Sequence, residues 1–250
     1  MRSAWCIAFL TIGIAQGQRQ QPGQGVNFYS RDKEVALGEQ LAQEFRQGTT
    51  PLGSAAVDDY VKRVGANLAA QLPGGWTFTF ETIRDERGGP THEPIAFPGG
   101  PIFVSADLIV TAQNEAEFAG MLAHAMAHVV ARRYTRQLSR ENLGSIQTAS
   151  LPVSAPGTAI PMGLLAFRRA NESEADYWAV KAMAAAGYDP AGLASYVDRV
   201  QPDGKDSIGP LPPRDWRVAA IEKEILNLPA GNYISSDRFD RIQVEVKRQR

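Results

Sequence analysis

Residues 121–130 read Met-Leu-Ala-His-Ala-Met-Ala-His-Val-Val and place two histidines, His124 and His128, four residues apart. In an α-helix this spacing puts both imidazoles on one face, about 40° apart around the axis. The neighbouring stripe of the helix is apolar and consists of Phe118, Leu122, Ala125 and Val129. Two imidazoles at this spacing can bind one metal ion. They can also be ordinary helix histidines that form hydrogen bonds with the backbone or with water.

An acidic segment further along the chain, Asn171-Glu-Ser-Glu-Ala-Asp176, opens another predicted helix. Glu172 and Asp176 are four residues apart and share a helix face. One carboxylate could therefore bind a metal while the other accepts the N–H of a ligating imidazole. Carboxylates are also favoured at helix N-termini by the helix dipole, which would explain them without a metal. Glu174 points away from Glu172 on such a helix, and we expect it to be solvated.

The composition is that of an ordinary globular protein. The chain has 250 residues, of which 44% are hydrophobic and 21% are charged. These values exclude a collagen, a low-complexity protein and a disordered acidic chain. The 26 Lys and Arg residues against 27 Asp and Glu residues give a net charge of −1. A nucleic-acid-binding protein would normally show a basic excess, so we expect no nucleic-acid partner.

Residues 1–17 have the pattern of a signal peptide. Arg2 provides a positive N-terminal region, Ala4–Ala15 is apolar, and Ala15-Gln16-Gly17 is a small-x-small cleavage signal. The apolar stretch has 12 residues, whereas a membrane-spanning helix needs about 20. An uncleaved anchor is the alternative. We expect an exported protein, periplasmic or extracellular, with no transmembrane span once the leader is removed.

Cysteine and histidine are both scarce in this chain. The one cysteine, Cys6, lies in the predicted leader, so the mature chain would have no disulfide and no thiolate ligand. A metal site must then use His, Asp and Glu, and the third of the three histidines is His92. His92 lies in a charged turn and is expected to be solvated. It would be the rival third ligand if Glu172 were not one.

The pattern along the chain predicts a flexible Gln/Gly-rich spacer (18–27), a main domain (28–228) and a C-terminal tail (229–250) without a clear period. Apolar residues at spacings of three and four predict helices over about 30–47, 55–72, 114–138, 172–186, 190–200 and 216–226. Short strands are predicted over 76–83 and 102–104. The Ser-, Gly- and Pro-rich residues 139–161 predict a loop or a mobile lid.

Seven short segments together carry a family pattern: Glu34-Val-Ala-Leu-Gly38, Tyr60-Val-Lys-Arg-Val-Gly65, Phe97-Pro-Gly-Gly-Pro-Ile-Phe-Val104, Asn114-Glu-Ala-Glu117, His124–His128, Glu172–Asp176 and Ala186-Gly-Tyr-Asp-Pro190. With them the chain resembles the gluzincin metallopeptidases of the CAAX-prenyl-protease/HtpX type, peptidase family 48 of the metallopeptidases, in their small soluble exported form. The resemblance runs from about Phe28 to Leu228.

This resemblance implies an α+β, zincin-like fold (a mini-gluzincin), mostly helical, with a small antiparallel or mixed sheet whose edge strand borders the zinc cleft. It implies one zinc ion (Zn²⁺) held by His124, His128 and Glu172, with Asp176 orienting a histidine. It also implies that the strand Ile102-Phe103-Val104 is the edge against which an extended or unfolded polypeptide lies.

The sequence departs from the family pattern at two positions. Ala125 follows the first histidine, where the family has the glutamate that serves as general base, and such a base contributes about 10²–10⁴-fold. Leu211 stands where the family has a histidine, six residues before an arginine that Arg217 matches. The family histidine and arginine are thought to stabilise the oxyanion. Arg217 can have that role, or it can be a surface cation of the last helix.

Two functions follow from these residues. The first is a zinc metalloendopeptidase that acts on exported or misfolded proteins, with an unrecognised group or hydroxide as base. The second is a zinc-binding pseudopeptidase that captures extended polypeptides as a chaperone-like or adaptor module. A purely structural zinc site is disfavoured, because three protein ligands usually leave an open coordination position. Two separate departures indicate natural loss of catalytic groups rather than an engineered substitution.

Overall fold

The computed structural model describes residues 22–84, 93–148, 162–202, 211–233 and 236–249, with side chains described outside 144–148 and 162–169. The predicted leader with Cys6, His92, and residues 149–161 of the predicted loop or lid lie outside these ranges.

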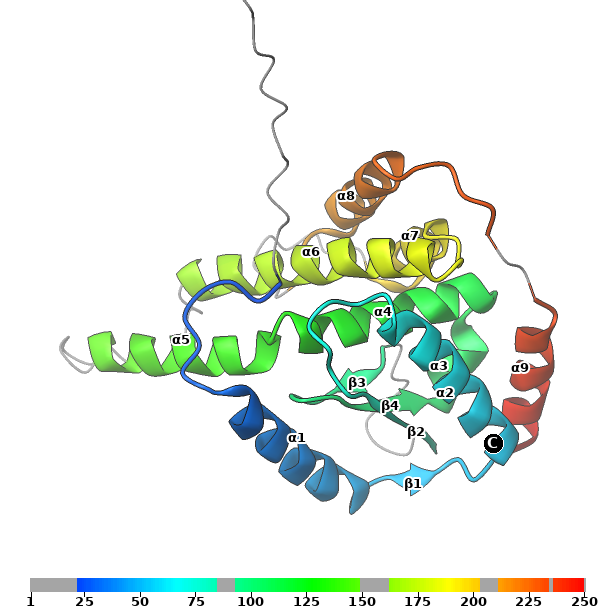
Figure 1. Ribbon diagram of the computed structural model, residues 1–250, viewed down its shortest axis with the longest axis horizontal. Coiled ribbons are helices and arrows are strands. Elements are labelled where there is room, and N and C mark those ends of the chain that lie inside the picture. Colours follow the sequence, from blue (N-terminus) through cyan, green and yellow to red (C-terminus); the bar gives the residue numbers. More distant parts are fainter. Residues whose placement is uncertain (1–21, 85–92, 149–161, 203–210, 234–235, 250) are drawn as a thin grey trace, which may run out of the picture.

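The described residues form helices and a small sheet (Figure 1). In chain order the elements are α1 (Arg31–Arg46), β1 (Thr50–Pro51), α2 (Ala55–Ala69), β2 (Thr79–Arg84), β3 (Ile95–Ala96), β4 (Pro101–Ser105), α3 (Ala106–Thr111), α4 (Glu115–Val130), α5 (Arg133–Thr148), α6 (Met162–Ala185), α7 (Ala191–Val200), α8 (Arg214–Leu226) and α9 (Arg238–Gln249). The expected α+β class, mostly helical with a small mixed sheet, is confirmed. No described helix is both long and apolar enough to cross a bilayer.

The four described strands are ordered β1-β2-β4-β3. The β2–β4 pair is parallel, whereas β1–β2 and β3–β4 are antiparallel. The prediction that Ile102–Val104 forms the edge strand is wrong, because these residues belong to β4, which pairs with β2 on one side and β3 on the other. All three are also buried. Within the described sheet, the edge beyond β4 is the two-residue strand β3.

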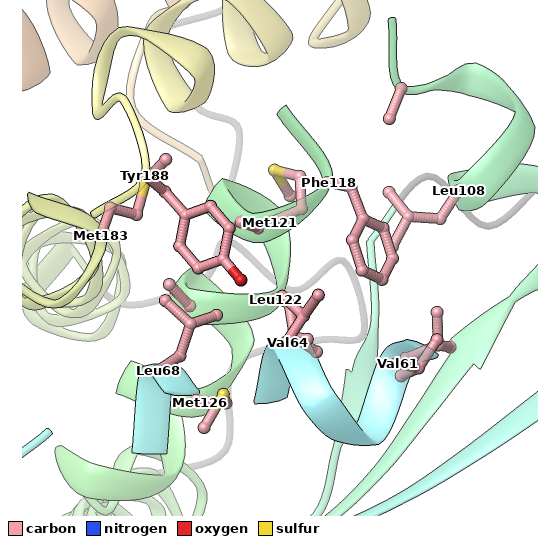
Figure 2. Close-up of a cluster of buried hydrophobic side chains, with 14 of the residues drawn as sticks. Val61, Val64, Leu68, Leu108, Phe118, Met121, Leu122, Met126, Met183 and Tyr188 are labelled. Carbon is pink, nitrogen blue, oxygen red and sulfur yellow. The ribbon is translucent and has the colours of Figure 1, made fainter. Parts of the chain in front are cut away.

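Helix α4 lies at the centre of the molecule. It packs against α6 and α7, and also against α2 and β3. Nearly all its residues are buried, because its sequence is apolar or small around the whole circumference. Figure 2 shows the cluster that it organises, with Val64 and Leu68 of α2 facing Leu122 and Met126 of α4. The predicted metal-binding histidines are thus on a helix that is buried along most of its length.

The chain breaks between α4 and α5, where one long helix was predicted over 114–138. Arg132 has a φ of 55°, in the left-handed region, which ends α4 at Val130. The Arg132 guanidinium donates to the buried carboxylate of Glu34 and to the carbonyl of Tyr29. These bonds offset the cost of the unfavourable backbone conformation. Helix α5 then continues to Thr148, so 139–148 is helical and the expected loop does not begin there.

The C-terminal tail forms part of the core. Phe239, Ile242 and Val246 of α9 are buried, and Phe239 stacks on Phe118 of α4 with ring centroids 5.5 Å apart. Their spacing of three and four residues is that of a helix. The charged and polar residues between them make the tail look like an alternation of charge and hydrophobicity, so this helical spacing was not recognised from the sequence. The boundary predicted at residue 228 therefore separates α9 from a core to which it contributes.

Candidate metal centre

Three predicted ligands meet between α4 and α6. His124 Nε2 and His128 Nε2 lie 2.9 Å apart, and Glu172 Oε2 lies 3.4 Å from the first and 3.6 Å from the second. Zinc bonds of about 2.0–2.1 Å at tetrahedral angles place ligand atoms about 3.3 Å from one another. The three atoms therefore form a triangle of the size that zinc needs. Imidazole nitrogen and carboxylate oxygen are also donors that zinc prefers.

The far side of the His124 ring contacts Asp176. Its Nδ1 lies 2.8 Å from Asp176 Oδ1, so a proton on Nδ1 leaves the Nε2 lone pair directed at Glu172 and His128. The Asp176 carboxylate in turn accepts two hydrogen bonds from Arg217, from Nε at 2.8 Å and from Nη2 at 2.9 Å. Both residues are buried. A carboxylate that contacts a ligating imidazole in this way holds the ring in one orientation.

Arg217 is thus not a surface cation. Arg217 is only 3% exposed, and its Nη2 lies 3.3 Å from His124 Nδ1. Its remaining nitrogen, Nη1, donates to Gln201 Oε1 at 2.9 Å, a contact that sequence reasoning missed. Leu211 lines a small pocket next to Arg217. Of the two alternatives that the sequence left open for Arg217, the structure agrees with the one near the site, and its pairing with Asp176 depends on the packing of α8 on α6.

Burial and charge together set the protonation of the site. Burial would lower the pKa of His124, but the Asp176 carboxylate raises it to about 9. Burial and the neighbouring His124 lower the pKa of His128 to about 4. Burial would raise the pKa of Glu172, but hydrogen bonds with both histidines hold it below its ordinary value. At neutral pH the Glu172 carboxylate is therefore ionised and His128 is neutral, whereas His124 is protonated and must release a proton before it can bind a metal.

A cleft of about 240 Å³ opens beside the ligand triangle. It lies between α4 and the sheet edge, and its lining includes Ala96 of β3, Phe97–Gly99, His124, Ala125 and His128. The residues Ile102–Val104 do not line it, since β3 lies between β4 and the cleft. The floor of the cleft at position 125 is a methyl group.

Helix α1 supports the far wall of this cleft. A Cβ on Gly38 would lie 1.6 Å from the carbonyl oxygen of Pro98, so only glycine lets α1 approach the 97–99 loop this closely. Nearby, the Glu34 carboxylate accepts hydrogen bonds from Arg132, Thr135 and Asn27. Glu34 lines the cleft but is occupied by these three donors.

Two further charged residues, which sequence reasoning did not assign to the site, line the cleft. Glu93 is exposed and lines both the cleft beside Ala125 and the pocket beside Arg217. Arg133, the first residue of α5, lies 2.9 Å from His128 Nε2 through Nη1 and 2.8 Å from Glu172 Oε1 through Nη2. Nothing in the local sequence marks Arg133, because its direction depends on the left-handed turn at Arg132.

Replacing Arg217 with methionine is expected to destabilise the metal-free protein by about 3 kcal/mol, because it removes the guanidinium from a buried carboxylate. His124 remains beside Asp176, which keeps the loss at the low end of the range for a broken buried pair. Arg214→Met on the same helix is the matched control, since its ion pairs with Asp198 and Asp215 involve exposed carboxylates. Urea unfolding of both variants measures the free energy of unfolding. Equal losses of this free energy in Arg217→Met and Arg214→Met would contradict the prediction.

Comparison with known proteins assigns the chain to a family. Residues 55–225 match the profile of peptidase family M48. The chain is 26% identical to a putative beta-barrel assembly-enhancing protease of Vibrio cholerae, over 72% of this chain and 40% of that protein. It is 23% identical to the beta-barrel assembly-enhancing protease of Escherichia coli, over 83% and 47% respectively. It is 31% identical to the mitochondrial metalloendopeptidase OMA1 of Schizosaccharomyces pombe, over 56% and 43%. The chain spans less than half the length of each of these three relatives.

Proposed function

Because the chain belongs to peptidase family M48, we propose that it is a zinc metalloendopeptidase with weak hydrolytic activity. In this proposal His124, His128 and Glu172 hold one zinc ion, and an extended polypeptide binds in the adjoining cleft. The observation that carries the proposal is the triangle of three ligand atoms facing a cleft bordered by the sheet edge. Zinc bound there would supply Lewis acidity for a peptide carbonyl and an acidified water.

The polypeptide would lie along β3. Ile95 and Ala96 use one side of their backbone to pair with β4, and Ala96 lines the cleft. A substrate in extended conformation can add to the other side of such an edge by backbone hydrogen bonds. Recognition through the backbone suits unfolded or misassembled chains, because it depends little on side-chain sequence.

Asp176 and Arg217 would act through the His124 ring. With zinc bound, the Arg217–Asp176 pair would keep a proton at His124 Nδ1 and so leave the lone pair at Nε2 for the metal. The guanidinium nitrogens of Arg217 donate to Gln201 and Asp176. Arg217 therefore lies next to Asp176, on the Nδ1 side of the His124 ring. We therefore assign Arg217 a positioning role, and its predicted contact with the oxyanion would need the substrate to reach the pocket that Leu211 lines.

Glu93 is our candidate for the missing base. The methyl group of Ala125 accepts no proton, and Glu34 already accepts three hydrogen bonds. Glu93 is the remaining described carboxylate in the lining of this cleft. Its exposed side chain precedes β3 and lines both this cleft and the pocket beside Arg217.

Substituting Glu93→Gln is expected to lower the weak hydrolysis of the wild-type chain by about 100-fold, because the amide cannot take a proton. The affinity for an uncleaved peptide should change by less than about threefold, since the side chain keeps its shape. A fluorogenic peptide and a binding isotherm measure the two quantities. Glu39→Gln, at an exposed position of α1, is the control. A rate equal to that of wild type would remove Glu93 from the mechanism.

A second candidate function is favoured by Ala125 and Leu211. If no base is available, the zinc-binding cleft would capture extended polypeptides without cleaving them, as a chaperone-like or adaptor module. Peptide binding that needs zinc, together with no detectable cleavage, would select this pseudopeptidase function over the first.

We place the protein outside the cytoplasm, with exported or misfolded proteins as substrates. The support is the predicted leader (1–17) and the beta-barrel assembly named in two relatives. The test is metal analysis of the purified chain lacking residues 1–17, followed by cleavage of casein and quenched peptides. We expect about one zinc per chain and slow cleavage that a chelator stops. A folded chain that binds neither zinc nor peptide would overturn the proposal.

A further inference from the structure

Arg133 reaches from α5 onto two of the three proposed zinc ligands. Its Nη1 lies 2.9 Å from His128 Nε2, and its Nη2 lies 2.8 Å from Glu172 Oε1. The Arg133 side chain is 32% exposed while that of Glu172 is 1% exposed. The guanidinium therefore lies on the solvent side of the ligand triangle, facing the cleft that it helps to line.

The contact with His128 and the binding of a metal use the same lone pair. Neutral imidazole has one nitrogen that accepts and one that donates. An N–H of Arg133 directed at His128 Nε2 needs the acceptor lone pair on that nitrogen. A zinc ion bound at Nε2 needs it as well. The two arrangements exclude each other at this atom.

Each buried carboxylate of the site already faces a guanidinium without a metal. The carboxylates of Glu172 and Asp176 face the guanidiniums of Arg133 and Arg217 respectively. With Arg133 in place, the ligand Glu172 is neutralised by a side chain. A divalent cation entering the triangle would lie a few ångströms from the Arg133 charge, and the repulsion at such distances is large in a partly buried site.

The backbone holds Arg133 at this place, while its side chain is free to leave. Arg132, fixed by Glu34, sets the direction of the first turn of α5. The 32% exposure of Arg133 leaves its long side chain a path into the cleft and water.

We propose that Arg133 is an internal cation that competes with zinc for His128 and Glu172, so that zinc binds only after the guanidinium has left the site. Arg133 thereby sets the metal affinity of this chain below that of the same three ligands alone. This inference rests on the proposed zinc site.

Metal affinity, measured without reference to hydrolysis, tests the competition. Zinc and cobalt titrations compare wild type with Arg133→Gln, Arg133→Lys and Arg46→Gln, the last a control whose Arg46–Glu81 pair lies at the exposed surface. We expect Arg133→Gln to bind zinc at least tenfold more tightly. Arg133→Lys should fall between it and wild type, because the charge remains without the two-pronged contact. Arg46→Gln should match wild type. An unchanged or weaker affinity in Arg133→Gln overturns the inference.

Thermal unfolding separates competition from a merely structural role. Removing Arg133 leaves the buried Glu172 carboxylate without its guanidinium, so the metal-free Tm should fall. Zinc should then raise the Tm of Arg133→Gln by more than that of wild type, since tighter binding stabilises more. A structural role alone predicts a parallel fall with and without zinc, which would overturn the inference. If neither wild type nor any variant binds one metal per chain, the proposed zinc site is wrong. That result differs from equal zinc affinity of wild type and Arg133→Gln, which contradicts the competition alone.

Discussion

Ala125→Glu is expected to raise peptide hydrolysis by about 10²–10⁴-fold, the contribution of a well-placed general base. Ala125 follows the ligand His124 on α4, lines the cleft and is 3% exposed. A carboxylate built at this position would point into the cleft beside the ligand triangle. It could take a proton from water there and return it to the leaving amine.

The gain depends on charge and on the metal, which two controls establish. Ala125→Gln adds nearly the same volume without a base and should stay at the wild-type rate. Ala125→Glu combined with His128→Ala should lose the gain, since one ligand is gone. Initial rates on a quenched peptide, with zinc supplied, measure all four chains. Equal rates for Ala125→Glu and Ala125→Gln would show that position 125 does not limit catalysis.

Glu172→Gln is expected to weaken zinc binding by more than about 100-fold. Loss of a residue that hydrogen-bonds to a metal ligand already lowers metal affinity by about 10–100-fold. The Glu172→Gln substitution removes the charged ligand itself. The amide keeps the size of the side chain, so the packing of α6 on α4 should persist. Chelator-competition titration of zinc gives the affinity.

Glu174→Gln is the matched control for this effect. Glu174 lies two residues along the same helix, where it accepts hydrogen bonds from the Gly23 N–H and from Arg136. Its neutralisation should change stability modestly and leave zinc affinity unchanged. Equal zinc affinities for Glu172→Gln and Glu174→Gln would remove Glu172 from the ligand set.

Helical spacing singled out two pairs of candidate residues but left open which carboxylate would bind a metal, and the ligand set His124, His128 and Glu172 came from the family resemblance. The i, i+4 pairs His124/His128 and Glu172/Asp176 each report one helix face, and buried helices keep that spacing. The contact between the two pairs came from the family resemblance, since spacing within one helix says nothing of which helices pack together.

Three other features depend on long-range contacts that local patterns do not contain. Arg133 is directed by the turn at Arg132, which Glu34 of α1 stabilises from about 100 residues away. The cleft edge is β3, whose two residues are too few to show an alternating pattern. Glu174 was expected in solvent, but it pairs with Arg136, and only the packing of α5 on α6 brings these two together.

The aromatic contact of Phe239 with Phe118 and Tyr60 has a consequence for the order of folding. These rings come from α9, α4 and α2, so the cluster cannot close until almost the whole described chain has been synthesised. Closing contacts between such distant segments is slow, and the partial chain keeps apolar surface exposed meanwhile. A newly made polypeptide of this sequence would thus keep the rings of Phe118 and Tyr60 partly uncovered until α9 has been synthesised.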